Sequence, residues 1–284
     1  MRPKNLPATV RQRRLGAELR RLRQQADLTT AQAGVLDGSS QPRISSIESG
    51  RYAVGADRVR ALARGYSCTD EAYIDALTEM TGGRTRGWWD EYRELLTLDA
   101  IDLAELEHHA TSMRTASVIH LPGLLQTRAH AHAVISDVVP PFAPHEVEHR
   151  VSYRIKRQVV LYRDNPMPLM AVIHEAALRM GFGGPEAARA QLKHLLDMSE
   201  LDHITVLVIP FGAGTFPGAG ANIYYMAGAV PALDTVQLDT EHGAAFLDAQ
   251  PQLIRYRTVL DRMEGCSLEP TKSRDLIRRI AADL

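Results

Sequence analysis

Cysteine is scarce in this chain, and apolar runs of membrane-spanning length are absent from it. The two cysteines, Cys68 and Cys266, lie far apart without a paired spacing, which argues against a disulfide framework or a zinc site. No apolar run approaches the roughly 18 residues that a membrane helix needs. The first 14 residues carry charge but lack the apolar core of a secretory signal. The sequence therefore predicts a cytoplasmic protein.

The sequence also lacks the common motifs of catalysis and nucleotide binding. The glycine-rich segment 211–222 has no Lys-Ser or Lys-Thr end and no following helix with an acidic partner, so it is not a phosphate-binding or dinucleotide-binding loop. There is no Gly-x-Ser-x-Gly elbow, and His130 and His132 lack the spacing of three or four that ligand pairs on a helix need. We predict no enzyme activity, no cofactor and no metal. Segment 211–222 is interpreted as a mobile loop, with the alternative that it rims a small-ligand pocket.

Basic residues are concentrated at the amino end. Residues 1–66 contain 13 Lys and Arg against 5 Asp and Glu, a net charge of +8, whereas the whole chain carries −1 and the remainder therefore −9. This asymmetry is expected when one end of a protein meets phosphates. We interpret residues 1–11 as a basic arm that either follows DNA or is a disordered tail.

Residues 12–51 have the pattern of three short helices separated by two tight breaks. The first helix, Gln12–Ala26, has an apolar stripe of leucines three and four residues apart, and arginines cover much of the rest. The second begins near Thr29 or Thr30, where a Thr can cap it, and ends by Gly38. The third begins at Ser39 or Ser40, and Gly50 ends it as glycine commonly does just after a helix.

Two short helices joined by a glycine-containing turn are typical of a DNA-reading helix-turn-helix when the second helix exposes small polar and basic side chains. The alternative is a helical bundle with a solvated face. We predict that Gln41 and Arg43 contact base edges and that Ser40 and Ser46 contact bases or phosphates. The predicted backbone contacts are Thr30, Arg51 and Arg14.

The run LTTAQAGVLDGSSQPRISSIESGR, residues 28–51, resembles the Xre or Cro-like helix-turn-helix. That motif has a Leu-Thr start, a glycine turn and a Ser-Gln start of the recognition helix, followed by Ser-x-Ile-Glu-x-Gly, which stands here at residues 45–50. Three residues depart from it: Thr30 where Gln is frequent, Gly34 where Ala is usual and Ser46 where Arg is common. We expect Gly34 to destabilise the second helix by about 1 kcal/mol relative to Ala.

The remaining patterns divide the chain into domains. Further helices over 56–66 and 69–81 complete an all-α, five-helix Cro-like helix-turn-helix domain over 12–81, and 82–101 is the connecting segment. Residues 102–284 are predicted to be an α+β domain with a small antiparallel or mixed sheet. Its predicted helices are 102–115, one beginning at Leu124, 144–162, 185–199, 250–263 and 271–282, and its predicted strands are 169–173, 204–209, 223–226 and 235–238.

The run PGLLQT, residues 122–127, carries a second resemblance. It is similar to a motif of a large actinobacterial class, the WhiJ-type or Scr-family antitoxin-like regulators, which place a Cro-like head before an antitoxin-like C-terminal domain of unknown function. Segments 173–218 and 256–281 follow the same domain. The resemblance implies a transcriptional regulator of the Xre family and a small BldB-like protein as a possible partner.

Three functions remain open on this basis. The first, which we favour, is a sequence-specific DNA-binding transcriptional regulator that acts as a homodimer on double-stranded DNA, with a C-terminal dimerisation or effector domain. The second is an antitoxin-like protein that binds the BldB-like partner and autoregulates its operon. The third is a small-ligand sensor that acts through the C-terminal domain.

Overall fold

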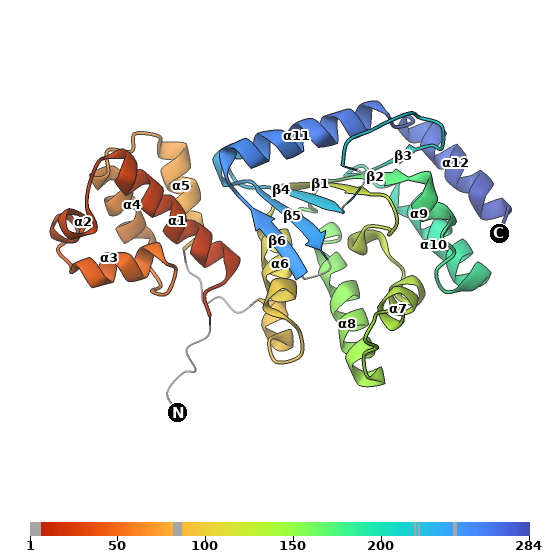
Figure 1. Ribbon diagram of the computed structural model, residues 1–284, viewed down its shortest axis with the longest axis horizontal. Coiled ribbons are helices and arrows are strands. Elements are labelled where there is room, and N and C mark those ends of the chain that lie inside the picture. Colours follow the sequence, from red (N-terminus) through yellow and green to blue (C-terminus); the bar gives the residue numbers. More distant parts are fainter. Residues whose placement is uncertain (1–6, 82–86, 219, 221, 241–242) are drawn as a thin grey trace. The chain divides into compact units, whose positions relative to one another are not determined.

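The computed structural model describes residues 7–81, 87–218, 220, 222–240 and 243–284, and the chain forms two compact units (Figure 1). One unit, called the head here, comprises residues 1–90 and 100–106; the other, called the body, comprises 91–99 and 107–284. Residues 1–6 of the predicted basic arm and 82–86 of the predicted connecting segment lie outside the described residues. In the described part of the chain, every helix is too short or too polar to span a bilayer.

The head contains the five helices that the sequence predicts. They are α1 Val10–Gln25, α2 Thr30–Leu36, α3 Gln41–Glu48, α4 Ala56–Gly65 and α5 Glu71–Glu79. Side-chain oxygens of Thr9, Thr29 and Asp70 accept backbone N–H groups at the starts of α1, α2 and α5. The apolar stripes of the helices meet in a core that includes Leu19, Ile44, Leu62, Ile74 and Leu77.

The body contains a mixed six-stranded sheet in the order β3-β2-β1-β4-β5-β6. Strand β2 pairs in parallel with β1 and β3, whereas β4, β5 and β6 continue from β1 in antiparallel pairs. The strands are β1 Ser112–Ser117, β2 Leu169–His174, β3 Ile204–Ile209, β4 Ile223–Ala227, β5 Thr235–Thr240 and β6 Gly243–Leu247.

Helices cover both faces of this sheet (Figure 1). Helix α11 lies along one face, where Leu253, Leu260 and Met263 join a core with strand residues such as Ala116 and Val236. Helix α8 lies on the opposite side. The helices of the body are α7 Arg128–Ser136, α8 Pro144–Arg157, α9 Glu175–Arg179, α10 Gly184–Met198, α11 Gln250–Gly265 and α12 Pro270–Ala282.

The predicted helix over 102–115 is wrong at its C-terminal end. Helix α6 spans Leu98–His109, and residues 112–117 form β1, a central strand of the sheet. The apolar spacing from Leu103 to Met113 continues across both elements, so the helical period extends into the strand. The sequence pattern does not predict β6, because this strand contains Gly243 and two alanines, residues that are depleted in strands. Most of the predicted helix 144–162 is α8, and its last residues form the 3-10 helix Gln158–Leu161.

Candidate DNA-binding surface

The turn between α2 and α3 is defined by glycine and by small polar residues. Gly38 has a φ of +65°, a backbone conformation that a side chain would strain. Ser40 stands at the N-terminal cap of α3 but makes no capping hydrogen bond, so its hydroxyl is not used in holding the helix. Pro42 lies in the first turn, where a missing N–H leaves no helical bond unmade.

Gly34 has a packing role that the helix propensities of glycine and alanine do not predict. A Cβ atom at this position would lie 3.0 Å from the carbonyl oxygen of Ser39 and 3.1 Å from the amide nitrogen of Gln41. The amide of Ser39 in turn donates to the Gly34 carbonyl at 2.7 Å. Glycine therefore allows the start of α3 to approach α2 closely. This close packing offsets the lower helix propensity that glycine has relative to alanine at position 34.

Helices α1 and α3 make an even closer backbone contact. A Cβ atom at Gly16 would lie 2.6 Å from the carbonyl oxygens of both Ile47 and Glu48. Because those atoms belong to the backbone, a side chain at position 16 would force the two helices apart. Gly16 thus fixes how far the C-terminal end of α3 lies from α1.

A buried ion pair joins the same two helices. Arg23 of α1 donates from Nε to Oε1 of Glu48 at 2.6 Å and from Nη2 to Oε2 at 2.9 Å, and the two side chains are only 9% and 7% exposed. A third donor of Arg23, Nη1, bonds the Leu28 carbonyl at 2.6 Å. These contacts give the glutamate of the Ser-x-Ile-Glu-x-Gly run a structural role: it anchors α3 to the first helix.

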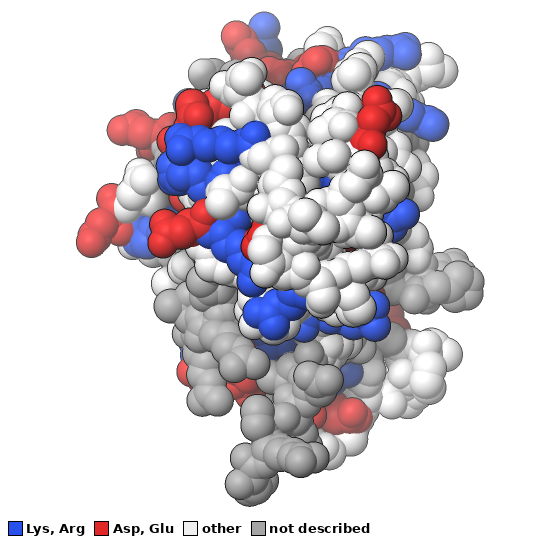
Figure 2. Space-filling model, turned by 90° about the vertical axis from the view of Figure 1, so that its left-hand side faces the viewer, with Lys and Arg blue, Asp and Glu red and all other residues white. Residues whose placement is uncertain are grey.

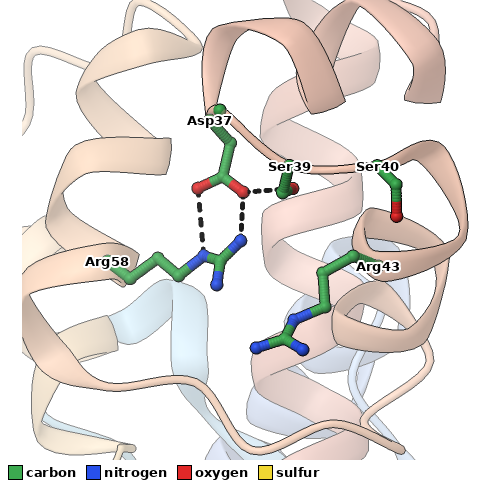
Figure 3. Close-up of a pocket in the computed structure, with 6 residues that line it drawn as sticks. Asp37, Ser39, Ser40, Arg43 and Arg58 are labelled. Atoms are coloured by element: carbon green, nitrogen blue, oxygen red, sulfur yellow. Dashed lines mark hydrogen bonds and ion pairs between the residues drawn. The ribbon is translucent and has the colours of Figure 1, made fainter.

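An open hollow of about 560 Å³ lies where α2, α3 and α4 meet, and it is lined by residues 37–40, Arg43 and Arg58. The carboxylate of Asp37 accepts both Nε and Nη2 of Arg58, and the Ser39 hydroxyl donates to it at 2.5 Å (Figure 3). Burial alone would raise the pKa of Asp37, but the bonds from Arg58 and Ser39 outweigh it and hold that pKa below its usual value. The Arg58 charge is therefore neutralised inside the head.

The four predicted base-reading or phosphate-contacting residues on α3 and at its cap lie at the surface of the head. Ser40 and Gln41 are exposed, and Ser46 is half-buried. Arg43 is half-buried: its guanidinium lies over the ring of Tyr52, with 3.3 Å between the Arg43 Cζ and the ring centroid, and its Nε has no hydrogen-bond partner among the described residues. Figure 2 shows a broad uncharged face of the head, bordered by both basic and acidic side chains.

The stacking of Arg43 on Tyr52 sets how easily this arginine can reach a ligand. A cation–π contact at a solvent-accessible site contributes about 0.5–1 kcal/mol. A charge-assisted bond to a base edge contributes more than that. The contact with Tyr52 therefore holds Arg43 near the start of α3 but is weak enough to be exchanged for a stronger one. The role of Tyr52 could not be predicted from the sequence, because no spacing rule relates a loop aromatic to a helix residue nine positions earlier.

The three predicted backbone contacts differ in their placement. Arg51 is exposed, with its Nε 2.9 Å from the Ser49 hydroxyl, and Thr30 is half-buried in the first turn of α2. Arg14, by contrast, is buried, and its Nε lies 3.0 Å from the carboxylate of Glu18, one turn further along α1. A buried arginine with this partner is not placed to reach a phosphate, so we leave Arg14 out of the proposed contact set.

The two histidines of α7, His130 and His132, lie in different environments. His130 is buried and His132 exposed, as their spacing on α7 requires. Nowhere in the described ranges are three or more His, Cys, Asp or Glu side chains placed to hold a metal ion. The His130 ring instead packs edge-on against Phe182, with 5.6 Å between centroids.

His130 makes the stability of the body depend on pH. Burial, with smaller contributions from the charge of Arg154 and from His120, lowers its pKa from 6.5 to about 4. Between these values the unfolded chain binds a proton that the folded chain does not, so stability falls as the pH drops. We expect the free energy of unfolding of the body to fall by about 2 kcal/mol from pH 7 to pH 5. Urea unfolding at both pH values should show a smaller difference for His130→Gln, and an undiminished difference would contradict this assignment.

Comparison with known proteins assigns both parts of the chain. Residues 14–77 match the family described as a helix-turn-helix domain, which spans α1 to α5 of the head and supports a DNA-binding regulator. Residues 100–279 match the family described as a domain of unknown function, DUF5753. No curated protein and no solved structure matches the chain. The protein thus has a helix-turn-helix domain at its amino end and, through the larger part of its length, belongs to the DUF5753 family.

Proposed function

We propose that this protein is a sequence-specific DNA-binding transcriptional regulator of the Xre type, with no enzymatic activity, that enters the major groove with α3. The observation that carries the proposal is the start of α3, where Ser40 and Gln41 are exposed and the Arg43 guanidinium lies over the ring of Tyr52. The helix is held against α1 by the close backbone contact at Gly16 and by the buried ion pair between Glu48 and Arg23. A rigid helix with adaptable polar side chains at its N-terminal end suits base reading.

The contacting residues divide by what they can reach. Gln41 and Arg43 carry amide and guanidinium groups that can form paired hydrogen bonds with adenine and guanine edges, respectively. Ser40 and Ser46 contact either bases or phosphates, and Thr30 and Arg51 contact phosphates. Arg58 contributes little charge to this surface because Asp37 neutralises it.

We further propose that two copies bind one two-fold site, with one α3 in each half-site and the half-sites about one helical turn apart. The body then serves as the dimerisation or effector domain, and the protein acts in the cytoplasm, on the chromosome. A small BldB-like partner, with an antitoxin-like role and autoregulation, stays a prediction from the sequence resemblance.

Arg43→Ala tests base reading. With duplexes selected by the full chain from a random pool, this variant is expected to weaken specific binding by about 1–3 kcal/mol and to leave binding to random duplexes much less affected. Fluorescence anisotropy with both duplexes at one fixed salt concentration measures the ratio of the two Kd values. Arg64→Ala, which removes an equal charge from an exposed pair with Glu71, is the matched control. Equal losses on both duplexes would remove Arg43 from the base-reading set.

Arg51→Ala tests phosphate contact and should behave differently. Because a phosphate contact carries no sequence information, the variant is expected to weaken binding to selected and random duplexes alike. The slope of log K against log salt concentration should become less steep by about one unit. A salt titration by anisotropy measures this slope, and an unchanged slope would show that Arg51 does not contact a phosphate.

A further inference from the structure

The sheet face turned away from α11 presents a row of polar side chains. The strand register places Thr115 of β1 opposite Tyr224 of β4, and Tyr224 opposite Gln237 of β5. Ser117 lies two residues along β1 and therefore on the same face. All four side chains are buried, with Thr115 and Ser117 each 1% exposed and Gln237 3%. A polar strip thus crosses three adjacent strands inside the body.

Several atoms around this strip are buried and have no hydrogen-bond partner among the residues that the structure describes. On the strands they are Oγ1 of Thr115, Oγ of Ser117 and Oε1 of Gln237. Both ring nitrogens of His130 and the Nδ1 of His120 are likewise buried and have no hydrogen-bond partner among the described residues. The two histidine rings share a neighbour, since His120 stacks on Phe182 at 5.2 Å and His130 meets it edge-on. Folded proteins leave few such atoms unpaired, so the set requires a physical explanation.

Arg154 of α8 supplies a charge to this region, and among the described residues no carboxylate binds it directly, although the nearby Asp239 acts on its charge. Its Nη1 donates to the neutral Oε1 of Gln126 at 2.8 Å. The neighbouring Arg157 differs, because Glu107 accepts its Nη2 and Nε at 2.5 and 2.8 Å. Burial lowers the pKa of Arg154, Arg157 adds to this effect, and Tyr224 and Asp239 partly offset it. Arg154 in turn contributes to the lowered pKa of both His120 and His130, so its charge acts on the strip and on the histidines alike.

The PGLLQT segment, residues 122–127, positions Arg154. Gln126 donates from Nε2 to the Leu121 carbonyl at 2.7 Å, which aims its Oε1 at Arg154. Two glutamines from other helical segments hold PGLLQT in place. Gln158 donates to the Gln126 carbonyl at 2.7 Å. Gln191 donates to the Leu125 carbonyl and accepts from the Thr127 amide, each at 2.7 Å. A segment buried with this many side-chain bonds is a rigid support rather than a linker.

We propose that this polar strip, together with Arg154 and the two histidines, binds a small organic anion. Arg154 holds its carboxylate or phosphate group, and the unpaired atoms of Thr115, Ser117, Gln237 and His130 bind its other polar groups. The Arg157–Glu107 pair stays intact behind the site. The proposal does not depend on DNA binding, and it gives the body a ligand class that the helix-turn-helix domain does not imply.

The first experiment titrates the full chain with inorganic phosphate and, separately, with acetate, and follows the Tm of the body. At a tenfold excess over Kd, the anion that fits is expected to raise the Tm by about 3–6 °C. Arg154→Met should lose this rise, whereas Arg128→Met, which removes an exposed arginine of the same domain, should keep it. A general stabilising effect of salt would raise the Tm of the unchanged protein and of both variants equally. An equal rise in all three proteins, or no rise with either anion, would overturn the proposal.

Thr115→Val keeps the proposal testable if Arg154→Met does not fold. The substitution keeps the shape of the side chain and removes a hydroxyl that has no partner. In the absence of added anion, the Tm is therefore expected to stay the same or to rise by about 2–4 °C. The Tm rise caused by the anion should shrink by at least half. A lower Tm without anion would show that a buried water already binds this hydroxyl, and it would overturn the proposal.

Discussion

Glu48→Gln is expected to lower the free energy of unfolding of the head by about 3–5 kcal/mol. The substitution keeps the size of the side chain but removes the charge that Arg23 binds at 2.6 and 2.9 Å. Arg23 would then remain as a buried cation on α1, and the third helix would lose its anchor. A loss of this size is a large part of the free energy of unfolding of a small domain. Hydrogen exchange resolved by peptide over residues 10–80 measures it.

The same head supplies a matched control for this variant. Arg64 and Glu71 also form a paired interaction, with Nη2 and Oε2 2.9 Å apart, but their side chains are 54% and 58% exposed. Since exposed pairs are screened by solvent, Glu71→Gln should leave exchange in the head unchanged. A Glu48→Gln head that exchanges as slowly as the Glu71→Gln head would show that the buried pair does not hold α3.

Glu107→Gln is expected to lower the free energy of unfolding of the body by a similar amount, about 3–5 kcal/mol. Glu107 is fully buried and accepts two hydrogen bonds from Arg157, which is itself buried. Removing the carboxylate charge leaves the Arg157 guanidinium buried without its acidic partner, and its charge repels the nearby charge of Arg154. Urea unfolding followed by circular dichroism measures the loss.

An exposed pair in the body serves as the comparison. Glu148 binds Arg128 at 2.6 Å, and both side chains are more than half exposed. Glu148→Gln should therefore give an unfolding curve that superimposes on that of the unchanged protein. If both glutamine variants moved the urea midpoint equally, burial would not be what makes the Glu107 pair important.

The head was predictable because each of its helices carries local information. The leucine stripe of α1 and the threonine caps of α1 and α2 lie within a few residues of one another, and Gly38 marks the turn. What could not be predicted was which arginines point inward. Arg14 and Arg23 look like the exposed arginines around them, and the partner that buries Arg23 stands 25 residues away.

The body shows where local pattern fails. Strand β1 reads Ser-Met-Arg-Thr-Ala-Ser, with one β-branched residue, and its neighbours β4 and β2 lie 50 or more residues further along the chain. Its strand conformation is therefore set by tertiary pairing rather than by propensity. The polar strip is hidden for the same reason, because Thr115, Tyr224 and Gln237 become neighbours only through the strand register.

The central claim is that the start of α3 lies in the groove of bound DNA. A photo-crosslinking side chain placed at Gln41, or in a second protein at the exposed Asp75 of α5, tests it on a selected duplex with the full chain. We expect crosslinks to bases from position 41 and none from position 75. Crosslinks from position 75 together with none from position 41 would contradict it.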